Sequence, residues 1–271
     1  MTQKLWDKIR ISAGSPDLTW ELFHENSKTD RYQGSLSDEQ VVAVMSQMWE
    51  SLPYTGYPRI DLPAPIAPLP MSLDKAMTGR VSTRDMQPSP LTAAEMASLL
   101  FYAYGVTRDN EGTGFARPFR VVPSGGALYP LEIYFHSSHV QGWDPGLYHY
   151  NPSKNNVRRL HSGDLYKPLS EALVQSELAV SASVHFFITA FFERSTFKYH
   201  DRGYRFILLE AGHVAQNINL VATALGLGCL NVGGYFDRQI DDILGLDGVT
   251  HSTIYMAAVG KPNTAEQNGE L

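Results

Sequence analysis

The sequence contains a single cysteine, Cys229, and no long run of apolar residues. One cysteine forms neither an intramolecular disulfide nor a cysteine-rich metal site. The N-terminus lacks the apolar core of a signal peptide, and no segment approaches the length needed to cross a membrane. Together these absences predict a protein of the reducing cytoplasm, with no membrane partner.

Positive charge is also scarce, because 28 acidic residues outnumber 22 basic ones and leave a net charge of -6. This balance argues against nucleic acid or an anionic membrane as a partner. The chain also lacks the dinucleotide-binding G-x-G-x-x-G spacing, the Walker lysine, the G-x-S-x-G elbow and the H-E-x-x-H zinc motif. Its nine histidines are scattered, so no metal site is predicted.

The composition divides the chain into three zones. Residues 1–71 form an N-terminal helical region and a proline-rich arm, residues 72–262 form the main body, and residues 263–271 form a polar, flexible tail. The arm at 52–70 cannot be helical, because its prolines favour extended backbone. It is either an inert linker or an arm lying over a surface, such as that of a partner subunit.

The main body mixes helical and strand patterns. Apolar residues at helical spacing predict helices, and short apolar runs bounded by turn residues predict strands. A predicted hairpin around Asn151-Pro152 requires antiparallel pairing, so we expect an α+β fold rather than a doubly wound one. The predicted helices cover residues 37–48, 91–105, 165–174 and 204–225, and the predicted strands cover 131–135, 146–150, 157–160, 184–192 and 253–259.

The densest group of reactive side chains lies in the connection between the predicted strand at 184–192 and the long helix that follows. A lysine in water has a pKa near ~10.4 and is a poor base at pH 7. Desolvation beside the apolar strand, with Arg202 and Arg205 nearby, would lower this pKa. Either a neutral Lys198 takes a proton from carbon with Tyr199 as its relay, or Lys198 stays charged and Tyr199 takes the proton.

A segment of alternating basic and hydroxyl residues is a candidate phosphate site. In extended backbone, Arg80, Ser82 and Arg84 would present two guanidiniums and a hydroxyl in one direction. These groups suit a phosphate and its attached polyol chain. A solvated basic turn would have the same composition.

Two pairs of glycines mark further candidate ligand contacts. In Pro123-Ser124-Gly125-Gly126 the glycines permit a close approach to a flat ligand, whose heteroatoms Ser124 and the backbone amides would address. The alternative for this segment is a plain turn. Gly233-Gly234 interrupts what reads as a buried strand, which is typical of a bulge or of a place where a ligand approaches the backbone.

These motifs, in this order, resemble those of the SagB-type azoline dehydrogenases, a family of the FMN-dependent nitroreductase superfamily. The resemblance extends from about Arg80 to Pro262, and the segment ELFHENSK near the start is similar to the family's N-terminal region. The motifs that carry it are R-x-S-x-R, PSGGALYPLE, a GLYHY hairpin, FKY with RGYR, E-A-G-H-x-x-Q-N and G-L-G.

The resemblance implies a nitroreductase-like sandwich with a mostly antiparallel central sheet flanked by helices, in an intertwined homodimer with FMN at the subunit interface. It implies oxidation of thiazoline or oxazoline rings in a ribosomally made peptide, with Lys198 and Tyr199 taking the proton and flavin N5 the hydride. The cofactor contacts it implies are Arg80, Ser82, Arg84 and Lys261 near the phosphate and ribityl chain, Pro123, Ser124, Gly125 and Gly126 near the isoalloxazine of the partner's FMN, and Gly233 and Gly234.

The resemblance also implies partners and leaves alternatives open. Without the extra front domain of some family members, we expect a cyclodehydratase complex to deliver the azoline peptide. One alternative is a general NAD(P)H-dependent flavin nitroreductase, and another is an oxidase for thiazolines on a nonribosomal peptide carrier. A third is a scaffold subunit of a cyclodehydratase complex, using the region of Trp6, Trp20 and Trp49 and the proline-rich arm.

Overall fold

The computed structural model describes residues 19–32, 34 and 36–263, and a central antiparallel sheet organises them. Eight strands lie in the order β1-β7-β6-β5-β8-β10-β2, with β9 also paired to β10, and a separate two-stranded sheet joins β3 to β4. The antiparallel α+β prediction is confirmed. The strands are β1 (Arg59–Asp61), β2 (Met86–Gln87), β3 (Val106–Arg108), β4 (Phe119–Arg120), β5 (Leu131–Ser137), β6 (Gly146–Asn151), β7 (Asn156–Ser162), β8 (Val184–Phe191), β9 (Gly228–Val232) and β10 (His251–Pro262).

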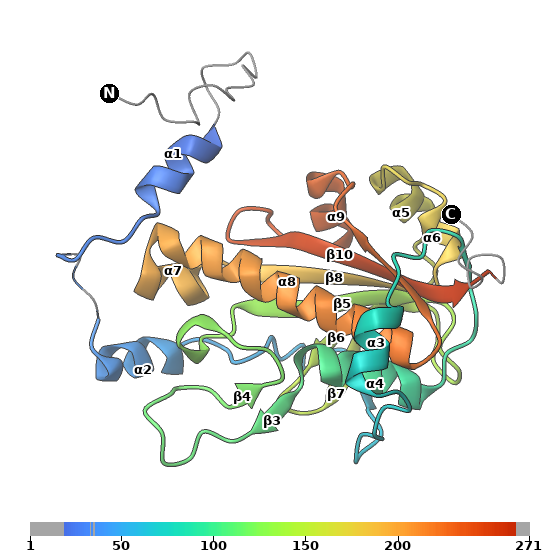
Figure 1. The fold of residues 1–271 in the computed structure, drawn as a ribbon, viewed down its shortest axis with the longest axis horizontal. Helices are drawn as coiled ribbons and strands as arrows, with labels where there is room; N and C mark the ends of the chain where they lie inside the picture. Colours follow the sequence, from blue (N-terminus) through green and yellow to red (C-terminus); the bar gives the residue numbers. More distant parts are fainter. Residues whose placement is uncertain (1–18, 33, 35, 264–271) are drawn as a thin grey trace.

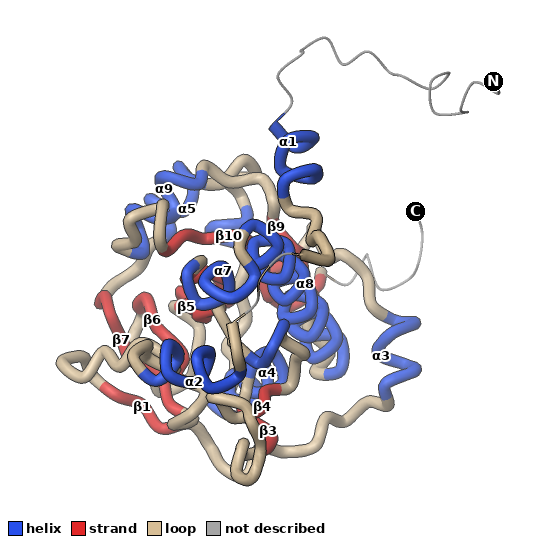
Figure 2. Tube along the Cα trace, turned by 90° about the vertical axis from the view of Figure 1, so that its left-hand side faces the viewer, coloured by secondary structure: helices blue, strands red, loops and turns tan. Residues whose placement is uncertain are grey.

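Helices cover both faces of the sheet, while the first helix stands away from the body (Figures 1 and 2). Every helix in the described ranges is too short or too polar to span a lipid bilayer. The helices are α1 (Thr19–Asn26), α2 (Asp38–Ser46), α3 (Leu73–Gly79), α4 (Ala93–Tyr104), α5 (Tyr166–Ala172), α6 (Leu178–Ser181), α7 (Glu193–Tyr199), α8 (Asp201–Ala224) and α9 (Asp237–Leu244).

The two faces of the sheet carry separate apolar cores, and β8 serves both. Phe186 and Ile188 pack into the core beneath α4 and α8, whereas Phe187 packs into the core beneath α5, α6 and α9. Successive side chains of a strand point to opposite faces, so a strand that is covered on both sides is apolar at most positions. This explains the largely apolar run that begins at Val184, in which the buried polar residues His185 and Thr189 are hydrogen-bonded.

Capping chemistry sets the helix starts that the sequence predicts. Ser37 and Gln40 form a capping box on α2, and Thr92 and Glu95 form one on α4. The long helix α8 is followed by Gly226 in the left-handed region, at φ 72°. The predicted helix at 165–174 and all five predicted strands are present with small changes in their ends.

Three expectations require correction. Lys198 lies within helix α7, not in a connection, because a short helix separates β8 from α8. Gly233 and Gly234 do not interrupt a strand, because β9 ends at Val232. The inert-linker alternative for the proline-rich arm is also wrong, because its β1 segment pairs with β7 as an edge strand of the chain's own sheet. The tail at 264–271 and Trp6 lie outside the described residues.

A buried carboxylate fixes the position of α7. Glu132, on β5, accepts hydrogen bonds from the Arg194 guanidinium at 2.8 Å and from His149 Nε2 at 2.7 Å. It also accepts from the Ser51 hydroxyl at 3.0 Å and from the Leu52 amide at 3.1 Å. One side chain therefore joins the start of the proline-rich arm, two strands and the helix that carries Lys198 and Tyr199.

The electrostatics of this cluster favour the ion pair. Burial alone would raise the pKa of Glu132, but the Arg194 charge and the hydrogen bonds from His149 and Arg194 outweigh it and hold the pKa far below its usual value. A depressed carboxyl pKa stabilises the folded state fully above the unfolded pKa of about 4.5, and this contribution is lost as the pH falls from there through the lower pKa of the folded state.

We expect the substitution Arg194→Met to lower the free energy of unfolding by about 3–5 kcal/mol, because it leaves a buried carboxylate without its cation. The matched control is Arg59→Met, which breaks an Arg–Asp pair of similar length, 2.9 Å, between two exposed side chains. The control should cost at most about 1 kcal/mol. Urea unfolding at pH 7 measures both values, and equal losses would contradict a structural role for the buried pair.

Candidate active site

Two segments that are far apart in the sequence meet at Gly126. This glycine has φ 64°, and a Cβ atom built on it would lie 2.5 Å from Tyr199 Oη and 3.2 Å from Lys198 Nζ. A Cβ on the preceding Gly125 would lie 3.1 Å from the Phe206 ring. The structure thus brings the predicted Lys-Tyr pair and the predicted glycine-rich loop together, and it leaves no room for a side chain between them.

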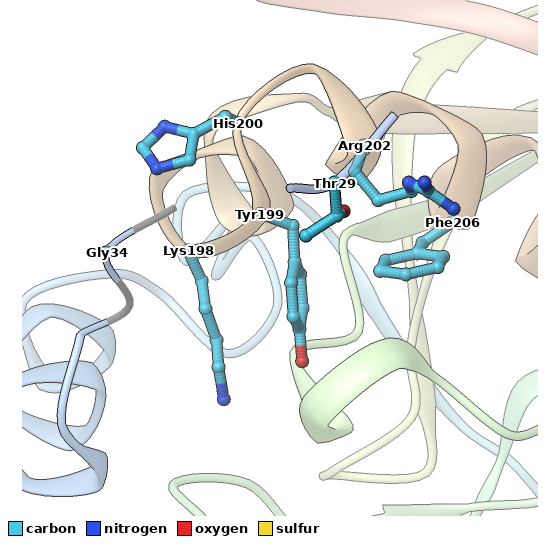
Figure 3. Close-up of a pocket in the computed structure, with 7 residues that line it drawn as sticks. All are labelled: Thr29, Gly34, Lys198, Tyr199, His200, Arg202 and Phe206. Carbon is cyan, nitrogen blue, oxygen red and sulfur yellow. The ribbon is translucent and has the colours of Figure 1, made fainter. Parts of the chain in front are cut away.

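The amine and the phenol extend side by side from α7 (Figure 3). Lys198 Nζ lies 5.3 Å from the centre of the Tyr199 ring, which packs edge-on against Phe206 with centroids 4.9 Å apart. A cavity of about 310 Å³ opens on this side, and Lys198 also lines a second cavity of about 230 Å³ on the Gly126 side. The residues of the first cavity are Thr29, Gly34, Lys198, Tyr199, His200, Arg202 and Phe206.

The loop from Pro123 to Tyr129 has a strained backbone. Gly126, Ala127 and Tyr129 all have positive φ, at 64°, 53° and 48°. Non-glycine residues rarely adopt such angles unless surrounding contacts impose them. Two contacts do so here: the Tyr129 amide donates to Ser124 Oγ at 3.0 Å, and the Arg120 amide donates to Tyr129 Oη at 3.0 Å. A third cavity, of about 570 Å³, lies beside this loop.

Arg202 and Arg205 bind the end of α1. Arg202 Nε donates to the Ser27 carbonyl at 2.8 Å, and Arg205 Nε donates to Ser27 Oγ at 2.8 Å. Arg205 also donates to the carbonyl of His24. Cations at a helix C-terminus satisfy its free carbonyls and complement its dipole. Their main observed role is therefore to hold the C-terminal end of α1 at the first turns of α8, and the suggested influence on Lys198 stays a prediction.

The predicted phosphate-binding residues gather at a different place, where β9 begins. Thr83 is buried and its amide donates to the Cys229 carbonyl at 3.0 Å, so its exposed neighbours Ser82 and Arg84 point outward. Arg80 follows α3 in extended backbone. Lys261, on β10, is exposed, and its register partner is Gln87 on β2, three residues after Arg84.

The charges at this place suit a phosphate. Within the described part of the chain, Arg80, Arg84 and Lys261 have no carboxylate within 4.0 Å. Three cations and a serine hydroxyl without acidic partners fit an anion with an attached polyol chain. Gly233 and Gly234 lie at the opposite end of β9, where the Gly234 carbonyl accepts from the Val174 amide at 2.9 Å. The described residues include no group of three or more His, Cys, Asp or Glu that could hold a metal ion.

The two groups of predicted site residues lie at opposite ends of α8. Helix α7, with Lys198, adjoins the first turn of α8, whereas α3 and the segment from Arg80 adjoin its last turns (Figure 1). The 24 residues of α8 make it about 36 Å long at 1.5 Å per residue. The structure does not bring all predicted site residues together within one chain.

A buried acid was missed by the sequence reasoning. Glu210 lies on α8 and is 2% exposed, and it accepts a hydrogen bond from Tyr104 Oη at 2.7 Å. Burial raises the pKa of Glu210 to about 7, against the opposing effects of hydrogen bonds from Ser124 and Tyr104 and the charge of Arg120. The sequence signal that could have identified it is its position next to Ala211, on the apolar face of the helix predicted at 204–225.

Comparison with known proteins places these features in a family context. The family model described as the nitroreductase family matches residues 77–261. A Methanocaldococcus jannaschii protein named as a nitroreductase is 40% identical over 174 residues, which cover 64% of this chain and 84% of that protein. The microcin B17-processing protein McbC of Escherichia coli is 34% identical over 151 residues, covering 53% of this chain and 55% of McbC. The trifolitoxin-processing protein TfxB of Rhizobium leguminosarum is 34% identical over 142 residues, covering 50% of this chain and 38% of TfxB.

Solved structures share the fold. A structure from Anabaena variabilis, titled as a nitroreductase, superimposes with a TM-score of 0.70 at 24% identity, over 93% of this chain and 49% of that one. The E. coli microcin synthetase McbBCD complex, with truncated pro-MccB17 bound, gives a TM-score of 0.59 at 22% identity, over 86% of this chain and 100% of the matched chain. The chain spans about half of the Anabaena protein and of McbC, and less of TfxB.

The contact at Gly126 gives a test with an internal control. We expect Gly126→Ala to destabilise the protein by about 1–2 kcal/mol for the left-handed backbone alone, and further because the new methyl group displaces Tyr199. Gly112→Ala has the same backbone cost, at φ 70°, but nothing lies within 4 Å of its Cβ. Chemical denaturation should show the larger loss at position 126. Equal losses would mean that Tyr199 does not pack against the loop.

Proposed function

The chain belongs to the nitroreductase family, and from this premise we propose that it is an FMN-dependent dehydrogenase that oxidises thiazoline or oxazoline rings of a ribosomally made peptide. Members of this family use FMN. The observation that carries the proposal is the convergence of Lys198 and Tyr199 on Gly126 beside a cavity. A flavin reductase needs no such pair of proton acceptors. The similarity to two proteins named for the processing of peptide toxins supports the choice of a peptide substrate.

The reaction removes two hydrogens from adjacent ring carbons. One carbon loses a proton, and the electron pair of its broken C–H bond forms the new carbon–carbon double bond as hydride leaves the neighbouring carbon. FMN, when bound, supplies the acceptor for that hydride. The chain must supply the base, and we assign this role to the amine of Lys198 or the phenol of Tyr199, which lie together beside Gly126.

The residues present fit both parts of the cofactor. Arg80, Ser82, Arg84 and Lys261 would hold its phosphate and ribityl chain, because they form a patch of cations and a hydroxyl without acidic partners. The loop of Pro123, Ser124, Gly125 and Gly126 would approach its ring system from the cavity of about 570 Å³ that Pro123, Ser124 and Gly126 line. Gly233 and Gly234 would allow a similar approach from β9.

The distance between these two groups supports an intertwined homodimer. The two groups lie toward opposite ends of α8, and we assign them to different subunits of the dimer. If both groups serve one cofactor, each site takes its phosphate contacts from one chain and Lys198 from a second copy. A twofold dimer then contains two such sites.

The partners that we propose are the azoline peptide and a cyclodehydratase complex. McbC, a relative of this chain, is named for processing microcin B17, and the solved McbBCD complex has a truncated pro-MccB17 bound. A comparable assembly would deliver the substrate to this chain. An oxidase for thiazolines on a nonribosomal peptide carrier would share the chemistry. It would differ from the proposed enzyme in the surface that docks the protein delivering its substrate.

The Methanocaldococcus relative favours a second candidate, a general NAD(P)H-dependent flavin nitroreductase. Such an enzyme reduces its flavin with a nicotinamide and does not need Lys198. Rapid anaerobic bleaching of the flavin by NADPH, together with nitroaromatic turnover that survives Lys198→Ala, would favour this candidate over the dehydrogenase.

We expect Lys198→Ala to lower kcat on an azoline peptide by about 10²–10⁴-fold while FMN stays bound, because it removes a proton acceptor and not a cofactor contact. Mass spectrometry follows the loss of two hydrogens per ring, and the flavin absorbance reports the cofactor. The control is Lys154→Ala, an exposed lysine in the β6–β7 turn. Near-normal turnover of the Lys198 variant would reject the proposal. A second variant, Tyr199→Phe, removes the phenol and tests whether Tyr199 is the base or only a relay for Lys198.

Subunit complementation tests the shared site. One variant combines Arg80→Ala with Arg84→Ala, and the other carries Lys198→Ala. If each site draws on both chains, a purified heterodimer has one intact site and should recover about half of the wild-type activity, although both parent homodimers are inactive. A heterodimer as inactive as its parents would place all contacts within one chain.

A further inference from the structure

Lys198 lies between two cavities. Its side chain lines the cavity of about 310 Å³ that Tyr199 shares, and it also lines the cavity of about 230 Å³ that Gly126 shares. A ring that is formed within a peptide continues into the peptide chain on both of its sides. A residue that acts on such a ring needs space for that chain on both sides of its own side chain, and Lys198 has this space.

Part of the lining of both cavities comes from the N-terminal region of the chain. Thr29 lines the first cavity, and Asp38 and Val41, at the start of α2, line the second. All three precede residue 77, where the match to the nitroreductase family model begins. These walls therefore lie outside the part of the chain that the family model describes, and they are a place where this chain can set a specificity of its own.

The first wall is held by a serine that lies two residues before Thr29. Ser27 is 1% exposed, its carbonyl accepts from Arg202 Nε at 2.8 Å, and its hydroxyl oxygen accepts from Arg205 Nε at 2.8 Å. Arg202 itself lines the first cavity. The backbone just before Thr29 is therefore tied to the start of α8, directly after the helix that carries Lys198.

The second wall is held by a buried arginine. Arg117 Nη2 donates to the carbonyls of Met45 at 3.1 Å and Met48 at 2.9 Å, at the end of α2. Val41 and Met45 of the same helix share an apolar cluster with Leu128, which also lines the second cavity. Both cavities thus have walls fixed by buried contacts, and a preformed site loses less conformational entropy when a ligand binds.

We propose that the two cavities receive the residues that flank the azoline ring in the substrate peptide, one flank in each cavity, and that Thr29 and the start of α2 help to select the peptide. The inference deepens the proposed function and rests on it for the ring chemistry at Lys198. Arg202 lines the first cavity and Asp38 the second, so the two flanks meet groups of opposite charge. A site with two chemically different ends fixes the direction in which a peptide lies across it.

Steady-state kinetics of the FMN-loaded protein on azoline peptides of different lengths tests the proposal. Thr29→Trp places a large ring at the first cavity, and Gly114→Trp does so at the second, where a Cβ on Gly114 has nothing within 4 Å. We expect each variant to raise KM about tenfold for peptides extended on one side of the ring, with kcat nearly unchanged, because it obstructs binding and not chemistry. The affected side should differ between the two variants. Peptides cut back to the ring on that side should recover the wild-type KM.

The matched control is Ser153→Trp, at an exposed residue of the β6–β7 turn that lines none of the three cavities, and it should equal wild type on every peptide. Equal KM changes for both flanks, or changes that do not depend on peptide length, would overturn the inference in an enzyme that still oxidises azolines. A wild-type protein that oxidises no azoline peptide would overturn the proposed function and this inference with it. If one tryptophan variant fails to fold, the other still has to discriminate between the two flanks.

Discussion

The ion pair between Glu132 and Arg194 is the contact on which the geometry of the candidate site depends. Arg194 is on the first turn of α7, and Lys198 follows it by four residues, one helical turn later. A buried charge without its partner costs several kcal/mol, so the guanidinium stays with the carboxylate, and the short helix stays against the sheet. The position of the Lys198 amine is thereby set by the ion pair between α7 and β5, and not by the stability of an isolated seven-residue helix.

Much of the fold follows from local patterns. Ser37 and Thr92 cap helices that the sequence predicts, and the apolar run from Val184 becomes a strand buried on both faces. These features depend on residues that are close in sequence, so a single sequence contains the necessary information. The association of FMN-binding motifs with the antiparallel sandwich came from resemblance, and the match to the nitroreductase family confirms that resemblance.

The sequence could not give the features that depend on distant residues. Local patterns predict a connection at Lys198 and Tyr199, because α7 is short and the partner that holds its Arg194, Glu132 on β5, lies 62 residues earlier in the chain. The sequence of the proline-rich arm does not indicate that its β1 segment pairs with β7. Glu210 has an ordinary helical context, and only the packing of α4 and of the loop at Ser124 makes its burial and its high pKa evident. Tertiary contacts decide each of these cases.

The division of the site between the two ends of α8 connects cofactor binding with stability. Arg80, Arg84 and Lys261 lie near one end, and among the described residues no carboxylate is within 4.0 Å of any of them, so an anion that joins them would relieve their mutual repulsion. An anion that binds only the folded state stabilises it by mass action. At the other end, the Lys-Tyr pair lines cavities beside the strained loop at Gly126. If both ends serve one cofactor, as proposed, a second copy of the chain would couple binding at one end to the chemistry at the other.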